Sequence, residues 1–232
     1  MRGVVELAHG VFTQSQDSDL RLLERTFSIR ANDVFFGVYG GALRQQMALD
    51  MPKASLRVVP EGFTDDEALS EGRIDLAICA TNKFSSDIKV QRLFTCPFVG
   101  LAREDHPIFD QPITAQRFIA YDHISVSRRG RARGPIDTVL AEQGLQRRVS
   151  FTTPTFYSAI FALAGADLIL PLMPQVLLKT LAPLGLKLRP FELPIPLQPV
   201  DIVQAWHPRL DNDHAHRWLR RTLKTFCDNA VA

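Results

Sequence analysis

Four short segments place polar, basic and aromatic side chains where a predicted strand gives way to a predicted helix. They are Asn32-Asp33, Gly62-Phe63-Thr64, Ser127-Arg128 and Pro154-Thr155-Phe156. The first turn of a helix offers backbone N–H groups and a partial positive charge, which favour an anion. A serine hydroxyl beside an arginine guanidinium adds hydrogen bonds that suit a carboxylate. The segments therefore predict a binding site for a small organic acid.

Three of these segments also have a purely structural interpretation, and the sequence leaves both interpretations open. Asn32 and Asp33 are residue types that cap the start of a helix. Phe63 and Phe156 suit a hydrophobic core as well as they suit the apolar body of a ligand. If both phenylalanines face the ligand, they indicate a ligand with an aromatic or apolar part.

Positive charge gathers in one loop, although the chain as a whole is only mildly basic. The 232 residues carry a formal net charge of +2, whereas a free-standing nucleic-acid binder usually has a clustered basic face. The loop adds Arg129, Arg131 and Arg133 to Ser127 and Arg128, and these arginines cannot all face one pocket. A solvated basic surface is the alternative to a ligand site. Contact with DNA is not favoured, because the loop lacks a helix or ribbon that could read a groove.

The sequence offers little support for catalysis or metal binding. Ser85-Ser86 has no neighbouring base motif, and neither a nucleophile elbow nor a phosphate-binding glycine loop occurs. His214 and His216 are two residues apart and so do not share a helical face. His207 follows a strand end that is expected to point away from the ligand. We therefore expect no catalytic residues, no metal and no cofactor.

Cysteine usage and hydropathy indicate a cytoplasmic protein. Cys79, Cys96 and Cys227 are far apart and follow no metal-ligand spacing, which is typical of reduced thiols. No stretch approaches the roughly 18 consecutive apolar residues of a membrane span. The N-terminus also lacks the apolar core of a signal peptide.

The elements that must position the four segments alternate between strands and helices. The first unit has strands at 26–31, 56–59 and 74–80 and helices at 34–50 and 64–71. The second has strands at 93–101, 121–126, 148–152 and 168–170 and helices at 136–143 and 154–164. A strand at 200–206 and a helix at 212–227 close the chain. Asp213 and Arg217 in this helix predict an ion pair, since they are four residues apart.

This order predicts an α/β fold of two Rossmann-like lobes, and the βαβαβ order of the first unit implies a parallel sheet there. The chain crosses between the lobes near 95–97 and 199–201, so two hinge strands are expected to join them. Lobe I would comprise 26–95 with 202–232, and lobe II 96–201, after a linker remnant at 1–25. A cleft between such lobes is the expected place for a ligand.

Several stretches resemble the effector domain of the LysR-type transcriptional regulators. They are Phe27-Ser28-Ile29-Arg30-Ala31-Asn32-Asp33, Leu69-Ser70-Glu71-Gly72-Arg73-Ile74-Asp75-Leu76-Ala77-Ile78, Arg103-Glu104-Asp105-His106-Pro107, and Trp206-His207-Pro208-Arg209 with Asp213, His214 and Arg217-Trp218-Leu219. Arg133-Gly134-Pro135-Ile136-Asp137 and Pro154-Thr155-Phe156 fit one subgroup of this family. The order and spacing of the motifs over residues 26–228 make the resemblance specific.

The resemblance implies a type 2 periplasmic-binding-protein fold whose small-molecule effector controls a winged helix-turn-helix. Residues 2–14 resemble the end of the family's linker helix, so the DNA-binding half is expected to be absent from this chain. DNA would then be contacted only through that half. Family members pair their effector domains as homodimers within tetramers.

The helix predicted at 34–50 is the expected dimer face, because it is apolar over a broad arc. The residues that suggest this are Phe35, Phe36, Val38, Tyr39, Leu43 and Met47. Gly37, Gly40 and Gly41 in the same helix indicate close helix packing, including packing against a second subunit.

Two other functions are compatible with the same fold. A solute-binding protein of a transport system is the first alternative, and the linker-like residues 2–14 and the absent leader argue against it. An enzyme such as a dehydratase or deaminase is the second, and the missing catalytic motifs argue against it.

Overall fold

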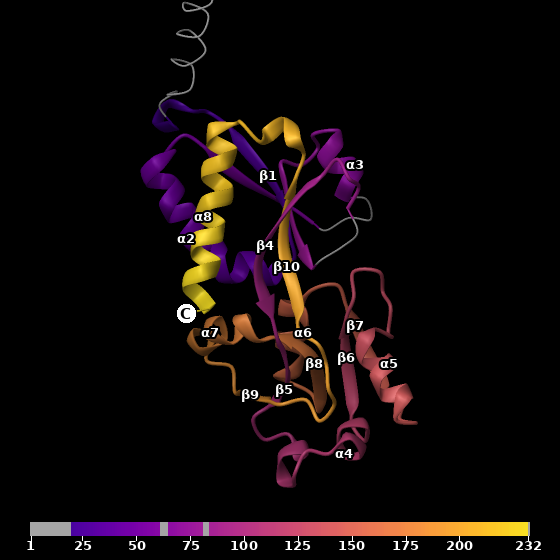
Figure 1. The fold of residues 1–232 in the computed structure, drawn as a ribbon. Coiled ribbons are helices and arrows are strands. Elements are labelled where there is room, and N and C mark those ends of the chain that lie inside the picture. Colours follow the sequence, from indigo (N-terminus) through magenta and orange to yellow (C-terminus); the bar gives the residue numbers. More distant parts are fainter. Residues whose placement is uncertain (1–19, 61–64, 81–83, 232) are drawn as a thin grey trace, which may run out of the picture. The chain divides into compact units, whose positions relative to one another are not determined.

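The computed structural model describes residues 20–60, 65–80 and 84–231, and the chain divides into two compact units. In the described chain, unit 1 holds residues 20–31, 39–93 and 203–231, and unit 2 holds 32–38 and 94–202. The helix predicted at 2–14 lies outside the described residues. Each unit contains a five-stranded sheet with helices packed against it (Figure 1).

The sheet of unit 1 has the strand order β2-β1-β3-β10-β4. Its strands are β1 (Thr26–Arg30), β2 (Ser55–Val59), β3 (Leu76–Ala80), β4 (Lys89–Cys96) and β10 (Val200–Trp206), and its helices are α2 (Asp33–Asp50), α3 (Asp65–Ser70) and α8 (His214–Val231). β1 pairs in parallel with both β2 and β3, which confirms the predicted βαβαβ arrangement. The first turn of α2 and one end each of β4 and β10 belong to unit 2.

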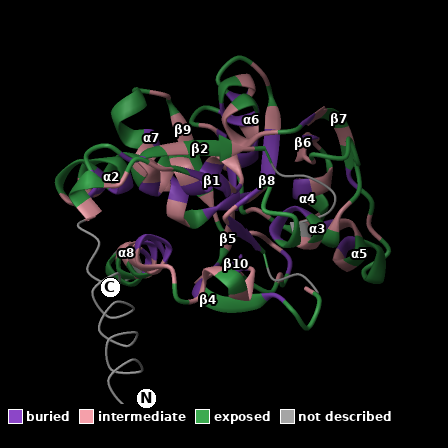
Figure 2. Ribbon diagram, turned by 90° about the horizontal axis from the view of Figure 1, so that it is seen from above, coloured by how far each residue is buried: buried purple, intermediate pink, exposed green. Residues whose placement is uncertain are grey.

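Helix α8 packs one side against unit 1 because its apolar residues recur every four positions. Leu219, Leu223 and Cys227 are fully buried, and a spacing of four places them on one side of a helix. Figure 2 shows this buried side, with exposed residues on the opposite side of the helix. The indole Nε1 of Trp218 donates to Oδ2 of Asp50 at 2.9 Å, which ties α8 to the end of α2.

The predicted dimer face of α2 is wrong for most of its residues. Phe35, Tyr39, Leu43 and Met47 are spaced by four and are all buried. Their side chains fill the interior of their own chain, so they offer no surface to a second subunit. The apolar arc of this helix therefore indicates intramolecular burial.

The sheet of unit 2 has the strand order β7-β6-β8-β5-β9. Its strands are β5 (Phe98–Arg103), β6 (Asp122–Val126), β7 (Arg148–Thr153), β8 (Leu168–Pro174) and β9 (Leu188–Phe191), and its helices are α4 (Ala115–Ile119), α5 (Pro135–Glu142), α6 (Phe156–Leu163) and α7 (Leu178–Leu181). β6 is parallel to β7 and β8, whereas β5 is antiparallel to β8 and β9. The sequence had not predicted α4, α7 or β9.

Helices cover both faces of this second sheet. Leu101 and Leu170 pack with residues of α6 and α7, whereas their neighbours Ala102 and Ile169 pack with residues of α4 and α5. Successive residues of a strand point to opposite faces. Unit 2 is therefore a sheet between two helical layers, and its loops extend from the strand ends.

The cysteines lie in the interior of the described chain. Cys79, Cys96 and Cys227 are buried, and among the described residues they form no disulfide. Burial raises the pKa of the Cys227 thiol to about 12. Within the described residues, the helices are too short or too polar to cross a membrane.

Candidate functional site

Three of the four predicted binding segments lie in unit 2, and hydrogen bonds bring them together. The backbone N–H of Ser127 donates to the carbonyl of Thr153 at 2.8 Å. The backbone N–H of Tyr157 donates to Oδ2 of Asp33 at 2.9 Å. Parallel pairing of β6 with β7 places both of their following loops at one edge of the sheet. The fourth segment, Gly62-Phe63-Thr64, lies outside the described residues.

Asn32 and Asp33 serve two different helices. Oδ1 of Asn32 accepts from the backbone N–H of Phe35 at 3.1 Å, so Asn32 caps α2. Asp33 directs its carboxylate to Tyr157, the second residue of α6. A carboxylate there satisfies one of the helix's orphan N–H groups and complements its positive end. The start of α6 therefore already binds a carboxylate of the chain itself.

Replacing Asp33 with alanine is expected to lower the free energy of unfolding by about 1 kcal/mol, because α6 loses this cap. Asp33→Asn keeps an acceptor of similar shape and should lose less. Urea denaturation of both variants measures the difference. An alanine variant as stable as the parent chain would show that the contact contributes nothing.

Tyr157 is a residue of this region that the sequence had not singled out. Its hydroxyl lies so close to α2 that a Cβ on Gly37 would stand 1.6 Å from it. The prediction that Gly37 permits close packing is thus confirmed, with the contact made inside the chain. Burial raises the pKa of the Tyr157 hydroxyl above its ordinary value, and the charge of Asp33 adds to the rise. Gly37, one turn after Asp33, was the sequence signal for this contact.

The Ser127 side chain holds the basic loop in shape. Its Oγ accepts from the backbone N–H of Arg131 at 3.0 Å, and Oγ of Ser125 donates to the carbonyl of Arg131 at 3.0 Å. Gly130 makes the turn between them in the left-handed region, with φ of +65°. Arg128 is exposed, so the loop presents this guanidinium to solvent.

The start of α6 combines a structural cap with a half-buried ring. Oγ1 of Thr155 accepts from the N–H of Ser158 at 3.3 Å and donates to Oγ of Ser158 at 2.7 Å, so Thr155 is the helix N-cap. Phe156 is half-buried against the core of unit 2, and Pro154 is exposed. Thr155 therefore has a structural role, because its hydroxyl caps the start of α6.

A buried ion pair fixes the far end of the basic loop. Nε and Nη2 of Arg147 each donate to a different carboxylate oxygen of Asp137, both at 2.9 Å. The N–H of Gly134 donates to the same carboxylate at 2.7 Å. Burial alone would raise the pKa of Asp137, but the hydrogen bonds from Arg147 and Gly134 hold it below its ordinary value. No local sequence pattern indicates this pair, which braces the loop against α5.

The motif residues of unit 1 form a polar network that connects distant parts of the chain. Asp75 accepts from the N–H of Ser28 at 2.7 Å and from Arg25 at 3.2 Å. Arg25 also pairs with Asp213 at 2.6 Å. Asp213 caps α8 by accepting from the N–H of His216 at 2.8 Å. The predicted ion pair of Asp213 with Arg217 is therefore wrong, since Asp213 binds Arg25 instead.

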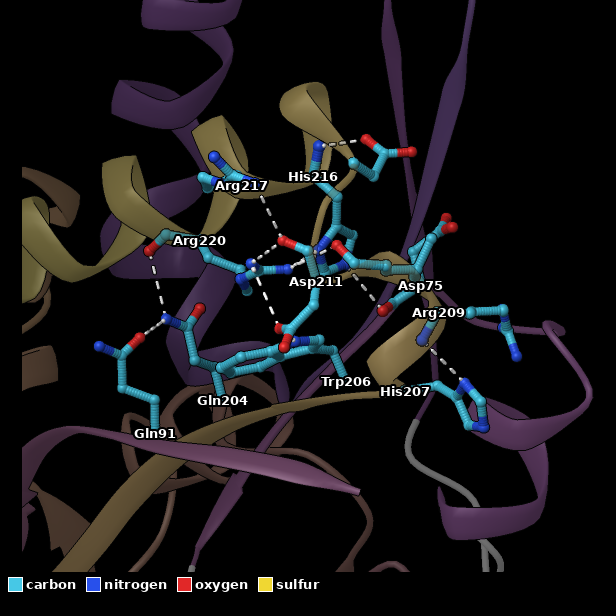
Figure 3. Close-up of polar contacts among 12 residues, drawn as sticks. Asp75, Gln91, Gln204, Trp206, His207, Arg209, Asp211, His216, Arg217 and Arg220 are labelled. Atoms are coloured by element: carbon cyan, nitrogen blue, oxygen red, sulfur yellow. Dashed lines mark hydrogen bonds and ion pairs between the residues drawn. The ribbon is translucent and has the colours of Figure 1, made fainter. Parts of the chain in front are cut away.

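Arg220 lies at the centre of this network (Figure 3). It donates to the carbonyls of Leu210 at 3.0 Å and Asp211 at 3.2 Å, and its guanidinium carbon lies 4.3 Å from the centroid of the Trp206 ring. Nη1 of Arg220 also lies 2.6 Å from Nδ1 of His216. Because arginine can only donate, Nδ1 must accept, and Nε2 of His216 must carry the proton. That proton is donated to the carbonyl of Asp75 at 2.9 Å.

Another pair of motifs meets through Arg209. Its Nη1 donates to the carbonyl of Ser70 at 2.7 Å, close to Gly72, whose φ of +76° turns the chain after α3. Nδ1 of His207 accepts from the N–H of Arg209 at 3.2 Å (Figure 3). The motif that contains Trp206, His207 and Arg209 therefore stabilises the fold of unit 1.

The arrangement in unit 2 can hold a polar molecule through backbone donors, hydroxyl groups and guanidinium groups. In the part of the chain that the structure describes, no group of three or more His, Cys, Asp or Glu residues is placed to hold a metal ion.

A family model described as the LysR substrate binding domain matches residues 26–228. The chain belongs to this family. The LysR family membership confirms the resemblance carried by the motifs, and it identifies the chain as the effector-binding domain of a LysR-type regulator. The alternative of a solute-binding protein for transport is not favoured.

Curated relatives of this LysR-type domain are transcriptional regulators. The chain is 31% identical over 224 residues to the HTH-type transcriptional regulator LinR of Sphingobium indicum, covering 94% of this chain and 71% of LinR. It is 27% identical over 201 residues to the HTH-type transcriptional activator NahR of Pseudomonas putida, covering 86% of this chain and 66% of NahR. The chain thus spans about two thirds of the length of NahR.

Solved structures of LysR-type domains share this fold. The regulatory domain of MexT, a transcriptional activator in Pseudomonas aeruginosa, has a TM-score of 0.74 at 25% identity, covering 88% of this chain and 98% of that domain. The BenM effector binding domain, solved with its effector benzoate, has a TM-score of 0.66 at 16% identity, covering 88% of this chain and 92% of that domain. The predicted type 2 periplasmic-binding-protein fold is confirmed.

Proposed function

We propose that this LysR-type domain recognises a small organic acid beside Asn32-Asp33, Ser127-Arg128 and Pro154-Thr155-Phe156. The observation that carries the proposal is the hydrogen bond from Ser127 to Thr153, at 2.8 Å. It holds the loop that carries Arg128 next to the start of α6, and a guanidinium group suits the recognition of a carboxylate. The fourth predicted segment, Gly62-Phe63-Thr64, belongs to the same proposal.

The effector is proposed to be a carboxylate with an aromatic or apolar body. Phe156 is half-buried beside the capping residue Thr155, so it can offer part of its ring to such a body. The BenM domain, which has the same fold, takes benzoate as its effector. Benzoate is therefore the first probe to use.

Benzoate is expected to raise the melting temperature of the chain. At one hundred times its Kd, a ligand that binds only the folded state stabilises that state by about 2.7 kcal/mol. Benzamide has the same ring without the charge and should have little effect. Arg128→Ala should weaken benzoate binding roughly tenfold or more, because a charge-assisted hydrogen bond is lost. Arg44→Ala removes an exposed arginine of α2 and should leave binding unchanged.

The outcomes of this thermal-shift series separate two parts of the proposal. Stabilisation by benzoate that persists in Arg128→Ala would remove Arg128 from the site while keeping the carboxylate. Equal stabilisation by benzoate and benzamide would contradict recognition of an anion. Turnover of the probe by the chain would support an enzyme and contradict a receptor.

We propose that effector binding shifts the population between two states of the domain and, in a protein built like its HTH-type relatives, controls DNA binding by a separate segment. The relatives are HTH-type regulators of which this chain spans about two thirds. A ligand that binds one state better than the other changes their balance. We also propose that the domain pairs as a homodimer, and that it forms a tetramer when joined to a DNA-binding segment. The sedimentation of the chain at rising concentration tests the pairing.

A further inference from the structure

Helix α2 is shared between the two units. Its first residues, within 32–38, group with unit 2, and its remaining residues, from Tyr39 onward, group with unit 1. A continuous helix normally moves as one rigid element. A helix with one end held in each unit must therefore either stay rigid or contain a place where it can open.

The first turn of α2 is fastened within unit 2 by three contacts. The Asp33 carboxylate accepts from the N–H of Tyr157 at 2.9 Å. The side chain of Val34 is buried in the main apolar cluster of unit 2. The Tyr157 hydroxyl rests against Gly37, where a Cβ would stand only 1.6 Å away. These contacts hold the turn by polar and apolar interactions together.

The rest of α2 is held within unit 1 by buried side chains and hydrogen bonds. Leu43 and Met47 are fully buried. Oδ2 of Asp50 accepts from the indole of Trp218 at 2.9 Å and from the amide of Gln46 at 2.8 Å. Fraying of this half is therefore opposed by the core of unit 1 and by α8.

Just beyond the boundary between the two parts, where the unit 1 part of α2 begins with the buried Tyr39, glycine weakens the helix. Gly37, Gly40 and Gly41 fall within five consecutive residues, and glycine is a poor helix former because it loses the most backbone freedom on folding. Packing explains Gly37 but not Gly41, since nothing lies within 4 Å of where a Cβ on Gly41 would stand. Gly41 also has no positive φ, so an alanine would fit without strain.

We infer that Gly40 and Gly41 form a joint at which α2 opens locally, so that its first turn and its remainder can change direction independently. In an α-helix the N–H of residue i bonds to the carbonyl of residue i−4. Opening at the joint therefore releases the amides of residues 41–45, whose acceptors are residues 37–41. The amides of residues 46–50, whose acceptors are residues 42–46, stay closed.

Amide hydrogen exchange on the chain alone tests the joint, without any ligand. Amides 41–45 are expected to exchange faster than amides 46–50. Gly41→Ala should slow exchange of amides 41–45 roughly three- to fivefold, as the difference in helix propensity predicts. Ala48→Gly is the matched control, because it places a glycine at another exposed position of α2. That variant should leave amides 41–45 unchanged.

Two results would contradict the proposal that α2 opens at Gly40 and Gly41. Uniform protection along 41–50 that Gly41→Ala does not alter would show that the glycines do not weaken the helix. Exchange at 41–45 that slows as protein concentration rises would assign Gly41 to an interface with a second copy of the chain. Both results are independent of whether benzoate binds, so the joint and the proposed effector can fail separately.

Discussion

Replacing Arg220 with methionine is expected to lower the free energy of unfolding by about 3–5 kcal/mol, which is the usual cost of removing one partner of a buried charged network. Methionine keeps much of the length but none of the donors. The carbonyls of Leu210 and Asp211 and Nδ1 of His216 would each lose their hydrogen bond from Arg220. The stacking of the guanidinium on Trp206 would also be lost.

Guanidinium-chloride unfolding of Arg220→Met measures this loss, and two variants serve as comparisons. Arg221→Met removes an exposed arginine one position further along α8 and should change stability by less than about 0.5 kcal/mol. Arg220→Lys keeps the charge but not the planar fork of donors, so an intermediate loss is expected. If Arg220→Met loses no more than Arg221→Met, the network does not support unit 1.

Acid is expected to destabilise both units between pH 6.5 and pH 4. Burial lowers the pKa of His216 to about 4, although the Asp75 carbonyl acts in the opposite direction. Burial also lowers the pKa of His123 in unit 2 to about 4, and the charge of Arg147 adds to the effect. In this window the unfolded chain binds a proton at each histidine and the folded chain does not, so stability falls as pH falls. Each histidine contributes up to about 3 kcal/mol.

Urea unfolding at pH 7.5, 5.5 and 4.5 measures this dependence. His123→Leu removes one buried titrating group, and part of the fall between pH 7.5 and 4.5 should disappear, whereas the lowered pKa values of His216 and His106 still contribute the rest. The carboxylates act in a different window, because the pKa values of Asp137 and Asp213 are lowered from 3.8. The stability that they contribute is lost only as pH falls below about 4. An unchanged pH slope in His123→Leu would contradict the assignment.

The sequence predicted the long, strongly patterned elements well and the short ones poorly. Helix α2 and strand β1 were predicted to within one residue, because their apolar periodicity and their turn residues agree. Strand β9 was missed, since Pro190 removes a backbone donor and argues against a strand. Its place at the edge of the sheet makes the proline acceptable.

The sequence predicted which residue types form the candidate site, but it did not predict which residues would be hydrogen-bonded to one another. Asp33 was singled out as a polar residue at a helix start, yet its partner Tyr157 lies 124 residues away in the chain. Only tertiary packing brings the two together. Arg147 and Asp137 are ten residues apart across a loop, and that spacing has no local signature. The order of the LysR motifs was the stronger guide, because it reflects the whole fold.

The network around Arg220 lies in unit 1, whereas the described segments proposed to touch the effector lie in unit 2. Because the two sets of residues lie in different units, protein engineering can change one set and leave the other unaltered. The exposed residues Arg128, Arg129 and Pro154 can be diversified in a library of ligand sensors, while the structural residues around them and residues 203–220 are left unchanged. New chemical selectivity would then be sought where the chain can accommodate variation, and the folding yield of the library would be protected elsewhere.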